Sequence, residues 1–190
     1  MILLKFSRII RIKRIEFWNL FYNKLLYGKK FNYSDGVKLH FDTNIIIDDE
    51  CNLCLMHCVF ARNHFTCRVT SEDKRNKGCV VIGSNTFFNE NCSINCMNSV
   101  LIGNDCLFGE NVHIYDHNHS YKDKNLLIRE QGFNSEKIVI GDNCWIGSNV
   151  VILKGVTIGK NSIIGAGCVV YKSVPDNSIL LSDGRILNKE

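Results

Sequence analysis

A six-residue spacing of large aliphatic side chains dominates the C-terminal third of the chain. It runs without a break through Ile140, Ile146, Ile152, Ile158, Ile164 and Val170. Two positions before each of these stands a residue that is usually small, in the set Ile138, Cys144, Val150, Val156, Ser162 and Cys168. Neither the 3.6-residue period of a helix nor the alternation of a single strand produces this spacing.

A repeat of this length predicts a solenoid of short parallel strands. Each six-residue unit forms one face of a triangular coil, and its large aliphatic side chain points into the lumen. Because each coil contacts only its neighbours, the apolar surface is buried by stacking. We therefore predict an all-β solenoid, a left-handed parallel β-helix of hexapeptide repeats with about six coils.

The same register continues upstream with interruptions. The upstream sets are Ile82, Phe88 and Ile94, then Ile102, Phe108 and Ile114, and a noisier one of Phe41, Ile47, Leu53, Val59 and Phe65. Longer breaks fall at 66–79 and 115–137, and a loop as long as the second is usually either functional or disordered. We predict a β-helix domain over 37–180 with the 115–137 loop inserted, an N-terminal segment over 1–36 and a tail over 181–190.

Basic charge is concentrated at the N-terminus. The formal net charge is +4, but residues 1–30 hold eight Lys or Arg and one acid, so the rest of the chain is net negative. This split disfavours nucleic-acid binding by the main domain. The mixture of apolar and basic residues predicts an N-terminal amphipathic helix, for which two interpretations stay open. It lies on an anionic membrane surface through residues 1–27, or it packs against its own domain or a neighbouring subunit.

The sequence also bounds where the protein works. No stretch reaches the roughly 18 to 20 apolar residues of a membrane-spanning helix, and cations interrupt the first apolar run, unlike in a signal peptide. We expect a cytoplasmic protein, with the inner membrane face as the place of any peripheral contact.

Ten cysteines invite a disulfide or zinc interpretation. The strongest zinc pattern is Cys51-x-x-Cys54, followed by His57, Cys58, His64 and Cys67. Five cysteines nevertheless fall at the small position of the repeat, namely Cys51, Cys92, Cys106, Cys144 and Cys168. We interpret these as small buried hydrophobes and expect no metal.

The run from Asn143 to Pro175, NCWIGSNVVILKGVTIGKNSIIGAGCVVYKSVP, resembles the signature stretch of hexapeptide-repeat acyltransferases. It is most similar to the sugar and polysaccharide O-acetyltransferases, which include galactoside acetyltransferase. The repeat similarity covers about 37–180, and the close match is confined to 137–179. The resemblance implies a homotrimer that transfers an acetyl group from acetyl-CoA to a sugar hydroxyl, in the synthesis of capsule, exopolysaccharide or lipopolysaccharide.

Such a transfer needs a base for the acceptor hydroxyl, and an imidazole titrates in the required pH range. The resemblance places a catalytic histidine on the loop before the Trp-Ile-Gly unit. His117 aligns best, His119 is the alternative, and spacing does not decide between them. Asp116 is a candidate to orient the imidazole or to contact the acceptor.

Further site residues follow from the resemblance alone. It implies acceptor contacts for Asn89 and Trp145, with Trp145 also close to the acyl group, although a turn asparagine and a packing tryptophan explain them equally well. The implied coenzyme contacts are backbone amides around Gly147, Gly165, Ala166 and Gly167, and the side chains of Lys172 and Arg185. One departure is the C-terminal LLSDGRIL, which lacks the family's Gly-x-Pro-Ala element near the coenzyme.

Three other functions remain open. The first is an N-acetyltransferase acting on a nucleotide-linked amino sugar. The second is a γ-type carbonic anhydrase, whose zinc would need three histidines such as His113, His117 and His119. The third is a non-catalytic β-helix that serves as an assembly scaffold.

Overall fold

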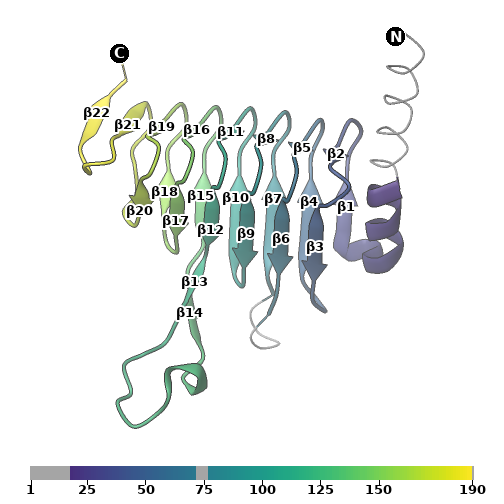
Figure 1. Cartoon of the computed structure of the whole chain (residues 1–190), viewed down its shortest axis with the longest axis horizontal. Helices are drawn as coiled ribbons and strands as arrows, with labels where there is room; N and C mark the ends of the chain where they lie inside the picture. Colours follow the sequence, from purple (N-terminus) through teal and green to yellow (C-terminus); the bar gives the residue numbers. More distant parts are fainter. Residues whose placement is uncertain (1–17, 72–76, 190) are drawn as a thin grey trace.

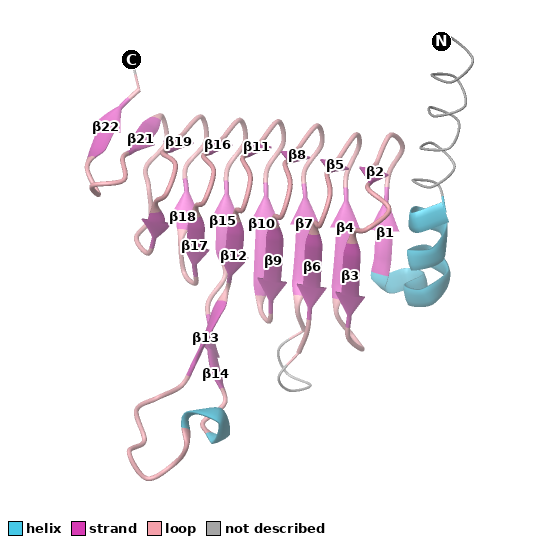
Figure 2. Cartoon of the chain, viewed as in Figure 1, coloured by secondary structure: helices cyan, strands magenta, loops and turns pink. Residues whose placement is uncertain are grey.

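The computed structural model describes residues 18–71 and 77–189, which form a stack of coils along one axis. A helix lies at the N-terminal end of the stack, and a hairpin arm projects from its C-terminal half (Figure 1). The strands of successive coils lie side by side along the long axis (Figure 2).

Successive strands of the stack belong to three sheets in turn. Each strand therefore pairs with the strand at the same place in the next coil. Sheet A comprises β1 (Phe31–Tyr33), β4 (Asn52–Leu55), β7 (Cys79–Ile82), β10 (Ser99–Ile102), β15 (Ile138–Ile140) and β18 (Thr157–Ile158). Sheet B comprises β2 (Lys38–Leu39), β5 (Phe60–Ala61), β8 (Phe87–Phe88), β11 (Leu107–Phe108), β16 (Trp145–Ile146), β19 (Ile163–Ile164), β21 (Ser178–Leu180) and β22 (Ile186–Asn188). Sheet C comprises β3 (Asn44–Ile47), β6 (Thr66–Val69), β9 (Ser93–Cys96), β12 (His113–Tyr115), β17 (Val151–Leu153) and β20 (Val169–Val170). Within these sheets, the pairings are parallel except for β21 with β22.

The lumen is filled as the repeat predicts. All twelve residues of the C-terminal pattern, the large position and the small one, are at most 3% exposed. Upstream, the rings of Phe88 and Phe108 stack with their centroids 4.4 Å apart. Burying one such aliphatic or aromatic side chain contributes about 1.5–3 kcal/mol, so the stack is the main source of stability.

The noisier upstream register was wrong at one position. Phe41 was predicted to fill the lumen, but it is 62% exposed. It falls in the turn after β2, while Leu39 and Ile45 supply the buried side chains on either side of it. The remaining members of that set are buried.

Most corners of the coil pass through a residue with a left-handed backbone, directly before a buried residue. Asparagine tolerates this conformation better than most residues. It occupies seven of these positions, Asn85, Asn91, Asn111, Asn143, Asn149, Asn161 and Asn177. Their amides also stack between coils, since Asn143 Nδ2 donates to Asn161 Oδ1 at 3.0 Å. The many asparagines therefore serve the corners.

The five cysteines predicted at the small position are buried, and all ten thiols are free. Cys51 faces the lumen whereas Cys54 lies on the outer side of β4, so the Cys-x-x-Cys pair does not converge. Burial raises the pKa of the Cys67 thiol to about 12 and that of Cys92 to about 11. Both thiols therefore stay protonated at neutral pH and are unreactive.

The long 115–137 insertion is an ordered arm. Its base is an antiparallel hairpin of β13 (His117–His119) and β14 (Phe133–Ser135), in which His119 lies opposite Phe133. A short 3₁₀ turn, η2 (Ile128–Glu130), lies near the tip. At the root of the arm, the amide of Glu136 donates to the carbonyl of Asp116 at 2.8 Å. The arm therefore leaves the stack between sheets C and A.

The two ends of the stack are closed differently. Residues 18–27 are helical and η1 (Gly28–Lys30) follows, whereas the predicted helix over 1–17 lies outside the described residues. The Asn19 amide donates to the His40 carbonyl at 2.7 Å, which ties the helix to the first coil. At the other end, β22 folds back on β21. Among the helices that the structure describes, none is long and apolar enough to cross a bilayer.

Candidate active site

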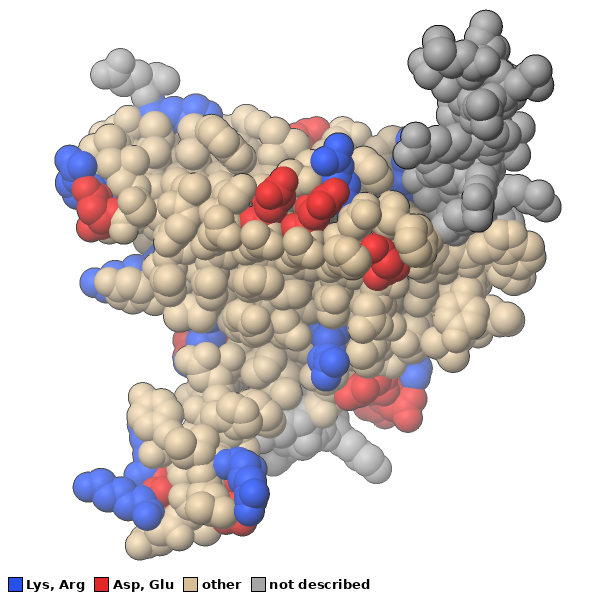
Figure 3. Space-filling model, in the orientation of Figure 1, with Lys and Arg blue, Asp and Glu red and all other residues tan. Residues whose placement is uncertain are grey.

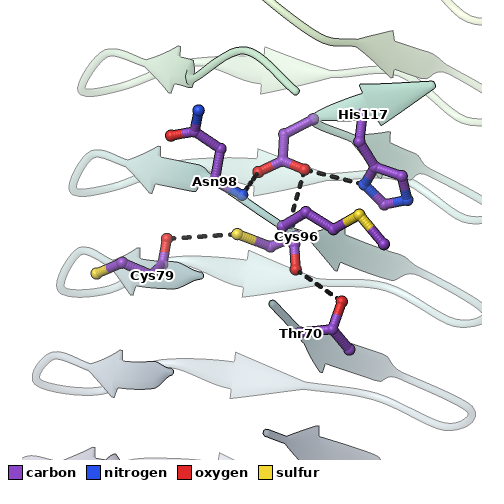
Figure 4. A network of polar contacts seen from close by, with 7 residues as sticks. Thr70, Cys79, Cys96, Asn98 and His117 are labelled. Carbon is purple, nitrogen blue, oxygen red and sulfur yellow. Dashed lines mark hydrogen bonds and ion pairs between the residues drawn. The ribbon is translucent and has the colours of Figure 1, made fainter. Parts of the chain in front are cut away.

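His117 stands at the corner where the chain leaves sheet C for the arm. Its Nδ1 lies 3.0 Å from Asp116 Oδ1, and Figure 4 shows the ring turned toward this carboxylate. The side chain of His117 is 17% exposed, so one edge of the imidazole reaches solvent.

Asp116 is completely buried and accepts hydrogen bonds on both oxygens. The backbone amide of Met97 donates to Oδ1 and that of Asn98 to Oδ2, each at 2.8 Å. Burial by itself would raise the pKa of Asp116, but hydrogen bonds from His117, from these two amides and from Cys96 outweigh it and lower the pKa below its usual value. Asp116 is therefore a carboxylate at neutral pH, and His117 must donate its Nδ1 proton to it. With Nδ1 as the donor, Nε2 is the ring nitrogen that can accept a proton.

The arm provides the other wall around the imidazole. Phe133 of β14 meets the His117 ring edge to face, with centroids 5.5 Å apart, and also contacts His119 at 4.3 Å. His119 is exposed, and no described carboxylate pairs with it. Of the two candidate histidines, His117 thus has a carboxylate partner and His119 has none among the described residues. Phe133 was missed by the sequence analysis because it belongs to the hairpin, outside the six-residue repeat.

A second group of candidate residues lies at the corner between sheets B and C. Phe88, Phe108, Ile146 and Ile164 are in register, so the residues that follow them form one column along the stack. This column contains Asn89, Gly147 and Gly165, with Ala166 and Gly167 one step further along the same corner. Trp145, 55% exposed, precedes the column on the outer face of sheet B.

The expectation that backbone amides at this corner contact the coenzyme needs a correction. The N–H groups of Gly147, Gly165 and Gly167 already donate to carbonyls of Ile164, Leu180 and Ser148 at 2.8–2.9 Å. They are not free donors for a ligand, because the coil ladder uses them. Gly147 is required by packing, since an added Cβ would lie 2.6 Å from the Ala166 nitrogen. Ala166 and Gly167 are the exposed residues of this corner.

Asn89 is likewise engaged within the protein. Its Oδ1 accepts hydrogen bonds from Arg62 at 3.3 Å and from the amide of Glu90 at 3.0 Å. Its backbone is not in the left-handed region, which Asn85 and Asn91 occupy on either side of it. The expectation that Asn89 forms a left-handed turn is therefore wrong, and its amide nitrogen remains the group able to meet a ligand.

Lys172 belongs to the same corner as His117, between sheets C and A. It follows β20, and its ammonium lies 5.6 Å from the Tyr171 ring centroid. A pocket of about 360 Å³ beside it is lined by Gly167, Tyr171, Lys172 and residues 180–184. Arg185 pairs with Asp183 at 2.7 Å, so its charge is already compensated. The hairpin of β21 and β22 is formed by the C-terminal segment in which this sequence lacks the family's Gly-x-Pro-Ala element.

The candidate residues therefore fall on two corners of the solenoid. Asp116, His117 and Lys172 share the corner between sheets C and A, whereas Asn89, Gly165, Ala166 and Gly167 share the corner between sheets B and C. The width of sheet C separates the two groups. Within one chain, Lys172 and Gly167 nevertheless line the same pocket, whereas Asp116 and His117 do not line it.

The three histidines considered as zinc ligands do not gather. Nδ1 of His113 lies 2.8 Å from Ser93 Oγ on the outer face of sheet C, and His117 faces Asp116. Within residues 18–71 and 77–189, no group of three His, Cys, Asp or Glu side chains has an arrangement suited to a metal ion.

The solenoid of six-residue units places the chain in the class of hexapeptide-repeat transferases. The family model described as bacterial transferase hexapeptide (six repeats) matches residues 137–172. A hexapeptide-repeat containing acetyltransferase from Vibrio cholerae is 32% identical, with a TM-score of 0.60 over 70% of this chain and 72% of that one. It has also been solved in complex with acetyl coenzyme A. The chain belongs to the hexapeptide-repeat transferase family.

Two curated relatives also match this chain. A galactoside O-acetyltransferase of Lactococcus lactis is 37% identical over 53% of this chain and 47% of its own length. A putative lipopolysaccharide biosynthesis O-acetyl transferase of Escherichia coli is 34% identical over 57% of this chain and 59% of its own length. The chain thus spans about half the length of the curated relatives that it matches.

Replacing Asp116 with asparagine should expose the role of the buried carboxylate. At neutral pH we expect Asp116→Asn to lower the free energy of unfolding by about 2–3 kcal/mol, because an amide cannot accept both backbone N–H groups. The lowered pKa of Asp116 stabilises the fold above the unfolded carboxyl pKa, and this is lost as pH falls through the folded value. The difference in unfolding free energy between the variant and the wild type should therefore become smaller below about pH 4.

Urea denaturation between pH 7 and pH 2.5 measures this gap. Asp35→Asn, at an exposed turn residue, is the control and should leave the unfolding free energy within about 0.5 kcal/mol. A gap for Asp116→Asn that stays constant down to pH 2.5 would contradict the assignment of an ionised, hydrogen-bonded carboxylate.

Proposed function

We propose that this protein is a left-handed β-helical O-acetyltransferase that moves an acetyl group from acetyl-CoA to a sugar hydroxyl during surface-polysaccharide synthesis. The observation that carries the proposal is the buried carboxylate of Asp116, which holds the His117 imidazole in the form that accepts a proton at Nε2. The names of the relatives, a galactoside and a lipopolysaccharide O-acetyltransferase, support a sugar acceptor. Because acetyl-CoA is an intracellular thioester, this function places the protein in the cytoplasm.

In the proposed reaction, His117 acts as a general base and then as a general acid. Its Nε2 takes the proton from the acceptor hydroxyl while that oxygen attacks the thioester carbonyl carbon. The resulting imidazolium is stabilised by the Asp116 carboxylate at 3.0 Å. When the carbon–sulfur bond breaks, the imidazolium returns the proton to the leaving sulfur. The products are the acetylated sugar and free CoA, and no acyl-enzyme forms.

Surface shape at two places fits the coenzyme. Ala166 and Gly167 are exposed, and nothing lies within 4 Å of a Cβ added at Gly167, so an extended ligand has room to lie along this corner. Lys172 supplies an exposed cation for the nucleotide phosphates. When bound, acetyl-CoA supplies the activated acyl group.

The division of candidate residues between two corners supports a homotrimer. In a closed ring with head-to-tail contacts, the corner with His117 of one subunit meets the corner with Ala166 of the next. Outward apolar side chains are available for such contacts, since Val151, Leu153 and Val169 continue along sheet C beyond β12. Sheet B presents a second apolar column of Phe87, Leu107, Trp145 and Ile163.

Replacing His117 should separate the two candidate bases. We expect His117→Ala to lower kcat for acetyl transfer by about 10²- to 10⁴-fold, because a single general base contributes that much. The matched control His119→Ala should retain most of the activity, since His119 has no carboxylate partner among the described residues. Release of free CoA thiol measures turnover, and thermal melting shows whether each variant folds. Loss of activity in His119→Ala but not in His117→Ala would reverse the assignment.

Mixing two inactive variants should test the shared site. Ala166→Trp blocks the exposed corner and His117→Ala removes the base, so each is inactive alone. In trimers refolded from an equal mixture, about one quarter of the interfaces combine two intact corners. Activity should therefore recover to about one quarter of the wild-type value. A mixture of His117→Ala with His117→Gln, both altered at one corner, should stay inactive. Absence of recovery in the first mixture would contradict a site between subunits.

We also propose that the N-terminal segment contacts anionic membrane. The part of this segment that the structure describes supports it, because the helix over 18–27 exposes Trp18, Tyr22, Leu25 and Leu26 by 56–74%. Lys29 follows them as an exposed cation, whereas Lys24 donates to the Phe31 carbonyl and Lys30 is paired with Asp49. The segment therefore combines apolar side chains with positive charge.

Deleting residues 1–27 should release the protein from anionic vesicles. We expect full-length protein to co-sediment with phosphatidylserine-containing vesicles and less so at high salt, because the attraction is partly electrostatic. Neutral phosphatidylcholine vesicles are the control and should capture less protein. Equal binding of the full-length and truncated proteins would refute a membrane role for this segment.

A further inference from the structure

A polar patch covers the outer face of sheet C over three successive strands. In register across β6, β9 and β12, one column contains Thr66, Ser93 and His113. The adjacent column contains Arg68, Asn95 and Tyr115. We call these six residues the sheet C patch. It ends two residues before His117, so it lies beside the proposed base.

Beyond β12 the patch is bounded by apolar surface, whereas on β3 the column of Thr66 continues to Asn44. In the next strand, Val151 and Leu153 take the places of His113 and Tyr115. Sheet B presents Phe60, Phe87 and Leu107 along its outer face, at the level of the same coils. Coil stacking places no demand on outward side chains, so these polar columns beside the proposed base are available to a ligand.

The patch is internally arranged by hydrogen bonds. Ser93 Oγ lies 2.8 Å from His113 Nδ1, and Asn95 Nδ2 donates to Ser93 Oγ at 3.4 Å. All three side chains are partly buried, and the Tyr115 ring packs beside His113 with centroids 6.4 Å apart. An arranged set of polar groups next to an aromatic ring is suited to a hydroxyl-rich ring.

Arg68 gives the patch a positive charge without a counter-charge. Its side chain is exposed, and no carboxylate of the described residues forms an ion pair with it. Asp116, at the end of the patch, is occupied by Met97, Asn98 and His117. A guanidinium presents two parallel N–H groups that match a carboxylate. In Figure 3, charged side chains of both signs are seen on the arm, at the C-terminal end and over the middle of the stack.

The distance from Arg68 to the base limits where a bound carboxylate can be. Neighbouring strands are about 4.8 Å apart, so Arg68 lies about 10 Å from Tyr115 across β9. His117 is two residues beyond Tyr115 at the corner. An acceptor hydroxyl at His117 and a carboxylate at Arg68 therefore belong to neighbouring units of one glycan.

We propose that the sheet C patch binds an acidic glycan, in which a carboxylate-bearing sugar pairs with Arg68 while the adjacent sugar presents its hydroxyl to His117. This inference rests on the proposed function and names its substrate class. Ser93, Asn95 and His113 bind hydroxyl groups, and Tyr115 packs against a sugar ring.

Matched acceptors test the inference. The test is to measure CoA release with cellobiose and with its uronic acid counterpart, in which one hydroxymethyl group is replaced by a carboxylate. We expect kcat/KM to favour the acidic acceptor by at least about tenfold, and Arg68→Gln to reduce that preference to near unity. Arg129→Gln, at an exposed arginine on the arm, is the matched control and should keep the preference.

A binding measurement keeps the test independent of turnover. Saturation-transfer NMR with glucuronate and glucose should show stronger contact for glucuronate, lost in Arg68→Gln and at high salt. Equal signals for the two sugars, or an unchanged preference in Arg68→Gln, would overturn the inference. So would a changed oligomeric state in Arg68→Gln, because the patch would then be a subunit contact. Absence of CoA release with every acceptor would instead count against the proposed function, while the NMR result still decides the acidic ligand.

Discussion

The whole structure depends on hydrogen bonding between identical coils. Each strand is only two to four residues long and is stable only because its amides donate to the strand in the adjacent coil. Such stacking is helped by corners that turn alike, and most corners turn through a left-handed residue, usually asparagine or glycine. It also uses the amides of Gly147, Gly165 and Gly167, so these residues shape the surface of a proposed coenzyme groove without donating to a ligand.

The active-site candidate arises where this regularity breaks. At Asp116 the chain leaves the six-residue repeat, and the carboxylate is buried where the repeat would have placed another turn. Two backbone amides from the preceding coil hold it ionised, and it in turn orients His117. The rigid stack therefore supplies the positioning that a base on a flexible loop would lack. Phe133, returning along the arm, closes the other side of the ring.

The outward faces of the coils are free to specialise, because they contribute little to the stack. Sheet B and the C-terminal part of sheet C are apolar, which suits contact between subunits. The sheet C patch is polar and carries the Arg68 guanidinium, which no carboxylate of the described residues pairs with. The same solenoid thus separates assembly, proposed catalysis and proposed acceptor binding onto different columns of residues.

The sequence by itself determined the class of fold, the lumen-facing residues and the burial of five cysteines, because a strict period leaves one side of each strand no alternative to the interior. It also narrowed the base to His117 or His119. It failed at Phe41, where the repeat is irregular, and at Phe133, which lies in a hairpin without periodic signal. Only the tertiary structure decided that Asp116 is buried against Met97 and Asn98, and that the candidate residues divide between two corners. These features depend on which coils lie side by side, and residues adjacent across coils are far apart in the chain.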